Sequence, residues 1–273
     1  MLNIFKRTLF FLLAFPAITA LPQMQTPTNL GSVVNSSARD AEPTFTADGQ
    51  TMYFNCFDRE GEEGSDICVS HLEGEDWGEP SIVWEVSTRE HLEVEPLLSP
   101  DGQQLYIMSN RPGGKGGMDI WVSDYVDGKW SSPTNLDAPI NSAYADHCLY
   151  FSGDDWEIAY WTSTRPGGFG GNDIWTSERV NGVWQEAKNL GPNINTAASE
   201  HHSLPSPDGN SLYITTTREG GFGGEDIFVT TRGADGNWSE LTNLGAQVNS
   251  DQHDRCPAFS PNFETFFFDS ERS

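Results

Sequence analysis

Short runs of alternating polar and apolar residues recur along the whole chain, and Gly, Pro and Asp separate them. In the best-defined stretch, residues 95–98 precede a Ser-Pro-Asp-Gly turn, and residues 104–109 alternate beyond it. A glycine-rich loop leads to a third run at residues 119–123, and the fourth is 129–132. Alternation between turn residues predicts short β-strands. No stretch has the periodicity of an amphipathic helix, so the pattern predicts an all-β protein.

The same order of motifs returns every 52–54 residues. The recurring motifs are a Trp, an Asn-Leu pair, an Asp-Ile-aromatic triplet with Asp66-Ile67-Cys68 as a weaker copy, and an Arg that precedes the glycine-rich loop. The tryptophans are Trp77, Trp130, Trp184 and Trp238, and the arginines are Arg59, Arg111, Arg165, Arg218 and Arg272. We expect the tryptophans to pack between units and the arginines to bind loop carbonyls or a carboxylate. Four-stranded antiparallel units repeated at this period predict the blades of a β-propeller.

Three of these motifs together resemble a known repeat. They are Ser-Pro-Asp-Gly at residues 99–102, Gly-Gly-x-Gly-Gly-x-Asp-Ile-Trp at residues 113–121, and Asn-Leu-Gly at residues 189–191. The chain resembles the WD40-like repeat of TolB-type propellers in bacterial envelope and secreted proteins, over roughly residues 24–272. The resemblance implies the fold and an extracytoplasmic setting. It implies little about chemistry, because such propellers serve as binding platforms, accessory domains and occasionally enzymes.

Five copies of the first strand predict five blades. Their approximate bounds are 40–92, 93–145, 146–199, 200–253, and 254–273 together with 24–39. We expect the N- and C-terminal segments to close the last blade, which removes an exposed sheet edge. The third strand of this blade has no counterpart in the sequence. The chain is truncated, which we favour, or residues before Met24 substitute for the strand, or a partner donates it.

Residues 1–20 have the features of a secretory signal peptide, which would leave a mature propeller at residues 21–273. Lys6 and Arg7 precede an apolar run that ends in small residues at 17–20. The run is short for a bilayer span, although a transmembrane anchor is the alternative. We therefore expect a periplasmic or secreted protein that does not insert into a membrane after cleavage. In that setting Cys56 and Cys68 form a disulfide across a hairpin or stay as two buried thiols.

The charge balance narrows the range of partners. The 273 residues include 15 basic and 40 acidic ones, and the formal net charge is −25. Such a surface repels phosphate, which excludes nucleic acid and disfavours anionic membranes. The sequence also lacks Gly-x-Ser-x-Gly, His-Glu-x-x-His and a nucleotide-binding fingerprint. These features favour a non-catalytic binding module for a protein or glycan ligand, and they leave the oligomeric state open.

An acidic residue opens the first strand of every blade. The series is Asp40, Glu93, Asp146, Glu200 and Asp254. These carboxylates either accept hydrogen bonds within each blade or surround the channel mouth and bind calcium or a polar ligand. In the second case Phe169 and Phe222, at the tips of two glycine-rich loops, would contact the ligand. The alternative function is a glycoside-cleaving enzyme that uses Glu93, Asp146 and Glu200, although five near-equivalent acids argue against it.

A second series lies two residues further along each strand, and it differs from blade to blade. Its members are Glu42, Glu95, Cys148, His202 and Cys256. Two thiols, an imidazole and two carboxylates suit zinc if they converge, which would make the chain a metal-stabilised structural propeller. Otherwise the thiols are small buried hydrophobes and His202 is a polar channel lining. We expect His147 and His201 to point away from this series.

Overall fold

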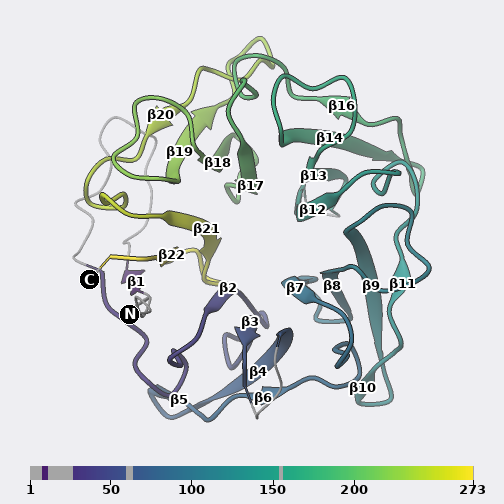
Figure 1. Ribbon diagram of the computed structural model, residues 1–273, viewed down its shortest axis with the longest axis vertical. Coiled ribbons are helices and arrows are strands. Elements are labelled where there is room, and N and C mark those ends of the chain that lie inside the picture. The colour runs from purple at the N-terminus through teal and green to yellow at the C-terminus, as the bar shows by residue number, and fades with distance from the viewer. Residues whose placement is uncertain (1–7, 12–26, 60–63, 154–155, 273) are drawn as a thin grey trace.

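Five antiparallel sheets surround a common axis, and we call the space along this axis the channel (Figure 1). The computed structural model describes residues 8–11, 27–59, 64–153 and 156–272. The sheets have the all-β, TolB-like propeller arrangement that the repeat predicts, with one sheet for each expected blade. The described residues contain no helix that could cross a bilayer.

Four sheets follow one plan, in which three long antiparallel strands run outward from the channel and short strands complete the outer edge. Blade one comprises β2 (Asp40–Phe45), β3 (Thr51–Phe57), β4 (Ser65–Glu73), β5 (Asp76–Trp77) and β6 (Ser81–Ile82). Blade two comprises β7 (Glu93–Leu98), β8 (Gln104–Ser109), β9 (Asp119–Val126), β10 (Lys129–Trp130) and β11 (Thr134–Asn135). Blade three comprises β12 (Asp146–Ser152), β13 (Ile158–Ser163), β14 (Asp173–Val180), β15 (Val183–Trp184) and β16 (Lys188–Asn189). Blade four comprises β17 (Glu200–Pro205), β18 (Ser211–Thr216), β19 (Asp226–Thr231) and β20 (Thr242–Asn243).

The fifth sheet is built from both ends of the chain. Strands β21 (Asp254–Phe259) and β22 (Thr265–Ser270) pair with each other, and β1 (Thr8–Phe11) pairs with β22. In this pairing Thr8 lies opposite Phe268 and Phe11 lies opposite Thr265. Residues before Met24 therefore take the third-strand position, which is one of the three alternatives left open by the sequence. The rest of the expected signal peptide lies outside the described residues.

The apolar core lies between neighbouring blades. Ile67 of blade one packs with Leu105 and Trp130 of blade two, for example, and Trp161 of blade three is fully buried. Of the four repeated tryptophans, Trp130 and Trp238 are buried and Trp77 and Trp184 are half-buried. Trp130 and Trp238 each belong to an apolar cluster that includes residues of two neighbouring blades, which confirms for these two the expectation that the tryptophans pack between units.

A disulfide joins Cys56 of β3 to Cys68 of β4, which are 12 residues apart in the sequence. Replacing both by alanine should lower the free energy of unfolding by about 3 kcal/mol, because a cross-link over a loop of this length restricts the unfolded chain. Chemical denaturation of the two proteins would measure the difference. Under reducing conditions the difference should largely vanish; if it persists in full, lost packing and not the cross-link causes it.

Candidate metal centre

The five acidic residues that open the inner strands are buried and bound within their own blades. In blade three, Asp146 accepts hydrogen bonds from the backbone N–H and the hydroxyl of Ser142, at 2.6 and 2.7 Å. Its other oxygen lies 2.6 Å from the guanidinium of Arg165. Arg165 also donates to the carbonyls of Pro139 and Ile140 in the segment that enters the blade. The equivalent ion pairs are Asp40–Arg59, Glu93–Arg111, Glu200–Arg218 and Asp254–Arg272.

This arrangement matches the alternative in which each acidic residue accepts hydrogen bonds within its own blade. Each carboxylate fastens the incoming segment to the arginine before the glycine-rich loop, so its oxygens are engaged inside the blade. The side chains of Glu93, Asp146 and Glu200 are 0% exposed. We therefore assign no ligand-binding role to the acidic series. The geometry also gives no support to an acid and base pair made from Glu93, Asp146 and Glu200, because all three have the same kind of partner.

The two loop-tip phenylalanines remain accessible. Phe169 is 49% exposed and Phe222 is 53% exposed. Their backbone N–H groups each donate to an aspartate that caps the loop, Asp173 or Asp226, at 2.9 Å. The loops are thus held from inside while the rings face solvent. A ligand-binding role for Phe169 and Phe222 stays a prediction.

The second series lies at a break in each inner strand. The pairing of β7 with β8 shifts register between Val94 and Leu97, and the other four inner strands shift at the equivalent place. The residue at each shift has a positive φ: Glu42 58°, Glu95 54°, Cys148 52°, His202 46° and Cys256 55°. This left-handed conformation costs a non-glycine residue of the order of 1 kcal/mol or more. Because the conformation recurs in every blade whichever residue occupies the position, it belongs to the repeated bulge.

These five side chains converge in the channel. The Nε2 atom of His202 lies 3.4 Å from the sulfur of Cys256 and 3.7 Å from the sulfur of Cys148. A carboxylate oxygen of Glu42 lies 3.4 Å from the Cys256 sulfur, and one of Glu95 lies 3.2 Å from the Cys148 sulfur. The ligand atoms of Glu42, His202 and Cys256 all lie within 4.8 Å of one another, as do those of Glu95, Cys148 and His202.

Backbone hydrogen bonds link the ring from blade to blade. Glu42 accepts a hydrogen bond from the backbone N–H of Glu95 at 3.0 Å, and Glu95 accepts one from the backbone N–H of Cys148. Arg39 lies 3.5 Å from Glu42 and 3.8 Å from Asp269. Each carboxylate thus keeps one oxygen on a neighbouring backbone and the other near a thiol. The oxygen beside the thiol is the one placed to bind a metal ion, and in Glu42 this oxygen also pairs with Arg39.

Burial is the main cause of the shifted pKa values in the cluster. It lowers the pKa of His202 to about 4 and raises the pKa values of Cys148 and Cys256 well above the usual thiol value. Burial, together with the charge of Glu95, raises the pKa of Glu42 to about 7. Burial alone would raise the pKa of Glu95, but a hydrogen bond from His147 and the charge of that histidine lower it to about 2. The metal-free ring therefore holds neutral thiols and a neutral imidazole, which a metal ion converts to ligands by displacing the thiol protons.

A cavity of about 340 Å³ opens next to the ring, on the side of the Ser-Pro-Asp-Gly turns. The five ring residues form one end of it, and its walls are mainly proline, leucine and aromatic side chains, including Pro96, Trp156 and Phe259. Apolar walls with a few polar groups at one end are typical of sites that bind small organic groups. The ring is therefore reachable from this cavity.

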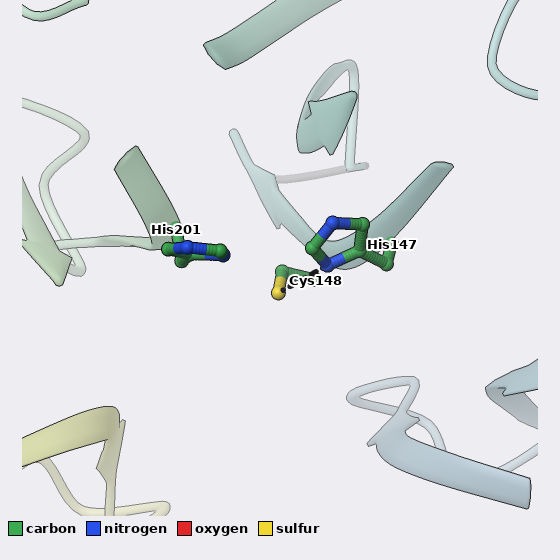
Figure 2. A group of neighbouring side chains, drawn as sticks. All are labelled: His147, Cys148 and His201. Atoms are coloured by element: carbon green, nitrogen blue, oxygen red, sulfur yellow. Dashed lines mark hydrogen bonds between the residues drawn. The ribbon is translucent and has the colours of Figure 1, made fainter. Parts of the chain in front are cut away.

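Two histidines that strand alternation predicts to point away from the ring belong to the same cluster. The Nδ1 atom of His147 lies 3.1 Å from the sulfur of Cys148, and His201 contributes a nitrogen within 4.8 Å of both. Figure 2 shows the sulfur between the two imidazole rings. The expectation that His147 and His201 point away from the ring is wrong, because the bulge at Cys148 and at His202 breaks the regular alternation of side chains.

Solved structures of low sequence identity share this fold. A TolB protein from Agrobacterium tumefaciens is 17% identical, with 98% of this chain and 79% of that chain covered and a TM-score of 0.54. TolB from Acinetobacter baumannii is 16% identical, with a TM-score of 0.57; the match covers 99% of this chain and 65% of that chain, slightly under two thirds. An α-L-arabinofuranosidase from Lactobacillus brevis is 12% identical, covers 85% and 84% of the two chains, and has a TM-score of 0.53.

At these identities the likeness concerns the fold alone, which is that of a TolB-like β-propeller. No protein-family model matches the sequence, and no curated protein is significantly similar to it. The function must therefore be argued from the channel itself.

Proposed function

We propose that this chain is a non-catalytic, metal-dependent binding propeller whose channel holds a zinc ion. We propose Cys148, Cys256, His202 and Glu42 as its ligands, from four different blades. The ligand atoms of Glu42, His202 and Cys256 lie within 4.8 Å of one another, and Cys148 joins them through His202, at 3.7 Å. One observation carries the proposal: His202 Nε2 lies 3.4 and 3.7 Å from the two thiol sulfurs. Tetrahedral zinc with ordinary bond lengths to sulfur and nitrogen places these ligand atoms about 3.5 Å apart.

The donor set favours zinc over calcium. Calcium takes six to eight oxygen ligands, whereas this ring offers two sulfurs and a nitrogen beside its carboxylates. Thiolate and imidazole ligands suit zinc and other soft or borderline transition metals. Since the acidic series that we considered for calcium is engaged inside the blades, we propose no calcium site.

Zinc should raise the thermal stability of metal-free protein. An ion that joins four blades binds the folded state and not the unfolded one. Zinc at about 1,000 times its Kd therefore adds about 4 kcal/mol to the free energy of unfolding. For a domain of this size that corresponds to an increase in Tm of about 10 °C. Calorimetry of protein treated with a chelator, with and without added zinc, would measure it.

Calcium and magnesium at the same concentration serve as controls and should leave the Tm nearly unchanged. An unchanged Tm with zinc would contradict the proposed metal centre. An equal increase with calcium would contradict the assignment of the thiols as ligands.

The cavity beside the ring supports a binding role for the same end of the channel. A protein segment or glycan that enters it meets apolar walls and then the metal ligands. The acidic surface favours a neutral or cationic partner. Titration of zinc-loaded protein with peptide and glycan libraries would test this role, and binding that persists after the cavity-wall variant Phe259→Ala would count against it.

The disulfide in blade one supports an oxidising compartment, and the TolB-like fold is compatible with the periplasm. We therefore propose that the protein acts outside the cytoplasm. Mass spectrometry of the protein purified from a periplasmic fraction would establish both its location and the residue at which the chain begins.

A further inference from the structure

The cluster of ligand atoms extends beyond the four residues proposed to hold zinc. On the side of the glycine-rich loops, His147, Cys148 and His201 form a separate triplet whose ligand atoms all lie within 4.8 Å of one another (Figure 2). His147 and Cys148 come from β12 and His201 comes from β17, so the triplet joins two blades. The proposed zinc ligands leave both of these histidines without a role.

The hydrogen bonds of His147 prepare its Nδ1 atom to bind a metal ion. Its Nε2 atom lies 3.2 Å from the carbonyl oxygen of Asn172, in the glycine-rich loop of the same blade. The amide nitrogen of Asn172 donates to the hydroxyl of Ser199 at 3.2 Å, which fixes the orientation of the amide. With Nε2–H directed at Asn172, the Nδ1 atom faces the Cys148 sulfur and the Glu95 carboxylate, and it becomes a ligand atom once a metal ion displaces any proton there. A ring N–H held by a carbonyl is the usual support of a metal-binding histidine.

A fourth ligand is already in place. A carboxylate oxygen of Glu95 lies 3.2 Å from the Cys148 sulfur and 3.9 Å from His147 Nδ1. Glu95 is not among the four ligands of the first ion, whose carboxylate comes from Glu42. The channel thus offers a second set of four donors, two imidazoles, a thiolate and a carboxylate, which is a set that zinc accepts.

Charge balance also favours two ions. When both thiols are deprotonated, Cys148, Cys256, Glu42 and Glu95 bring four negative charges into a buried ring. One divalent ion and the guanidinium of Arg39, 3.5 Å from Glu42, balance three of them and leave one, and buried unbalanced charge is costly. A second divalent ion compensates the remaining charge.

We propose that the channel binds a second divalent transition-metal ion, held by His147 Nδ1, His201, Glu95 and the thiolate of Cys148, which bridges the two ions. This inference rests on the proposed zinc centre because Cys148 belongs to both sites. The second ion lies toward the glycine-rich loops, and the first lies toward the cavity. The two ions would then be held by residues from all five blades.

The number of zinc ions per chain tests the inference. Full-length protein is saturated with zinc, dialysed and analysed by elemental mass spectrometry. We expect about two ions per chain in the wild type and about one in the variants His147→Gln and His201→Gln, since either removes one ligand of the second ion only. His71→Gln, at an exposed histidine, is the matched control and should retain about two.

The outcomes separate the two proposals. A wild type that binds one zinc ion, unchanged in both histidine variants, overturns the second site and leaves the first intact. No bound zinc in the wild type overturns both. Two ions in the wild type and in both variants place the second ion elsewhere and overturn its assignment. Circular dichroism checks that the variants fold, and a wild-type stoichiometry of one ion or none overturns the second site even if they do not.

Discussion

Serine at both Cys148 and Cys256 should lower the zinc affinity of the channel by about 10⁴-fold. Structural zinc sites with four protein ligands bind with about 10–16 kcal/mol, so each ligand contributes about 3 kcal/mol. Loss of two thiolates therefore costs about 6 kcal/mol, and each 1.4 kcal/mol is tenfold in affinity. Both thiols are buried and neither forms a disulfide. Serine replaces each sulfur by a hydroxyl oxygen and keeps a side chain of similar size. Competition with a zinc chelator of known affinity would measure the change.

The other two cysteines provide the matched control. Replacing Cys56 and Cys68 by serine removes the disulfide of blade one, which contributes no ligand atom to the ring, and should leave the zinc affinity unchanged in protein that remains folded. If the two double variants lose zinc equally, general destabilisation explains the loss. If the Cys148 and Cys256 variant binds zinc like the wild type, the proposed ligands are wrong.

Replacing Asp146 by asparagine should lower the free energy of unfolding by about 3–5 kcal/mol, which corresponds to a decrease in Tm of about 10 °C. Asp146 is 0% exposed, and the Arg165 side chain is 11% exposed. The substitution keeps the shape of the side chain but leaves the guanidinium without its carboxylate inside the protein. It also weakens the hydrogen bonds from Ser142 that hold the incoming segment. Chemical denaturation of the metal-free proteins would measure the loss.

The control for this prediction is the same substitution at an exposed ion pair. Asp137 lies 2.8 Å from Lys115, and their side chains are 71% and 42% exposed. Asp137→Asn should change the stability very little, because solvent screens such pairs. Equal effects at the two positions would contradict the view that the buried carboxylates fasten each blade together.

The fold could be predicted from the sequence because every feature of a blade recurs at nearly the same spacing. The strand at Gln104–Ser109 has the bounds that the alternation indicates, and β7 begins two residues before its predicted start at Glu95. The recurrence also groups Glu42 and its four counterparts into one ring, since equivalent positions in a closed propeller surround its axis. These were the parts of the site that the sequence could indicate.

Other features depend on atoms that the repeat does not specify. The acidic series and the arginine series were both visible, but whether Asp146 faces Arg165 or the channel depends on side-chain direction. His147 was placed on the opposite face because a regular strand alternates, and the bulge at Cys148 breaks that alternation. The pairing of β1 with β22 was one of several alternatives, because an apolar run without turn residues specifies no register.

The positive φ at the five bulges has a consequence for how this channel can diversify. The backbone fixes the direction of each side chain, and one residue per blade fixes its chemistry, so donor atoms can be exchanged singly while every strand stays in place. A change such as Cys256→His or Glu42→Cys would replace one donor atom at a position whose backbone conformation is already set. It would therefore alter which metal ion the ring prefers. A propeller of this kind therefore offers five equivalent positions for engineering metal coordination, of which Glu42 and Glu95 also hold the backbone of the next blade.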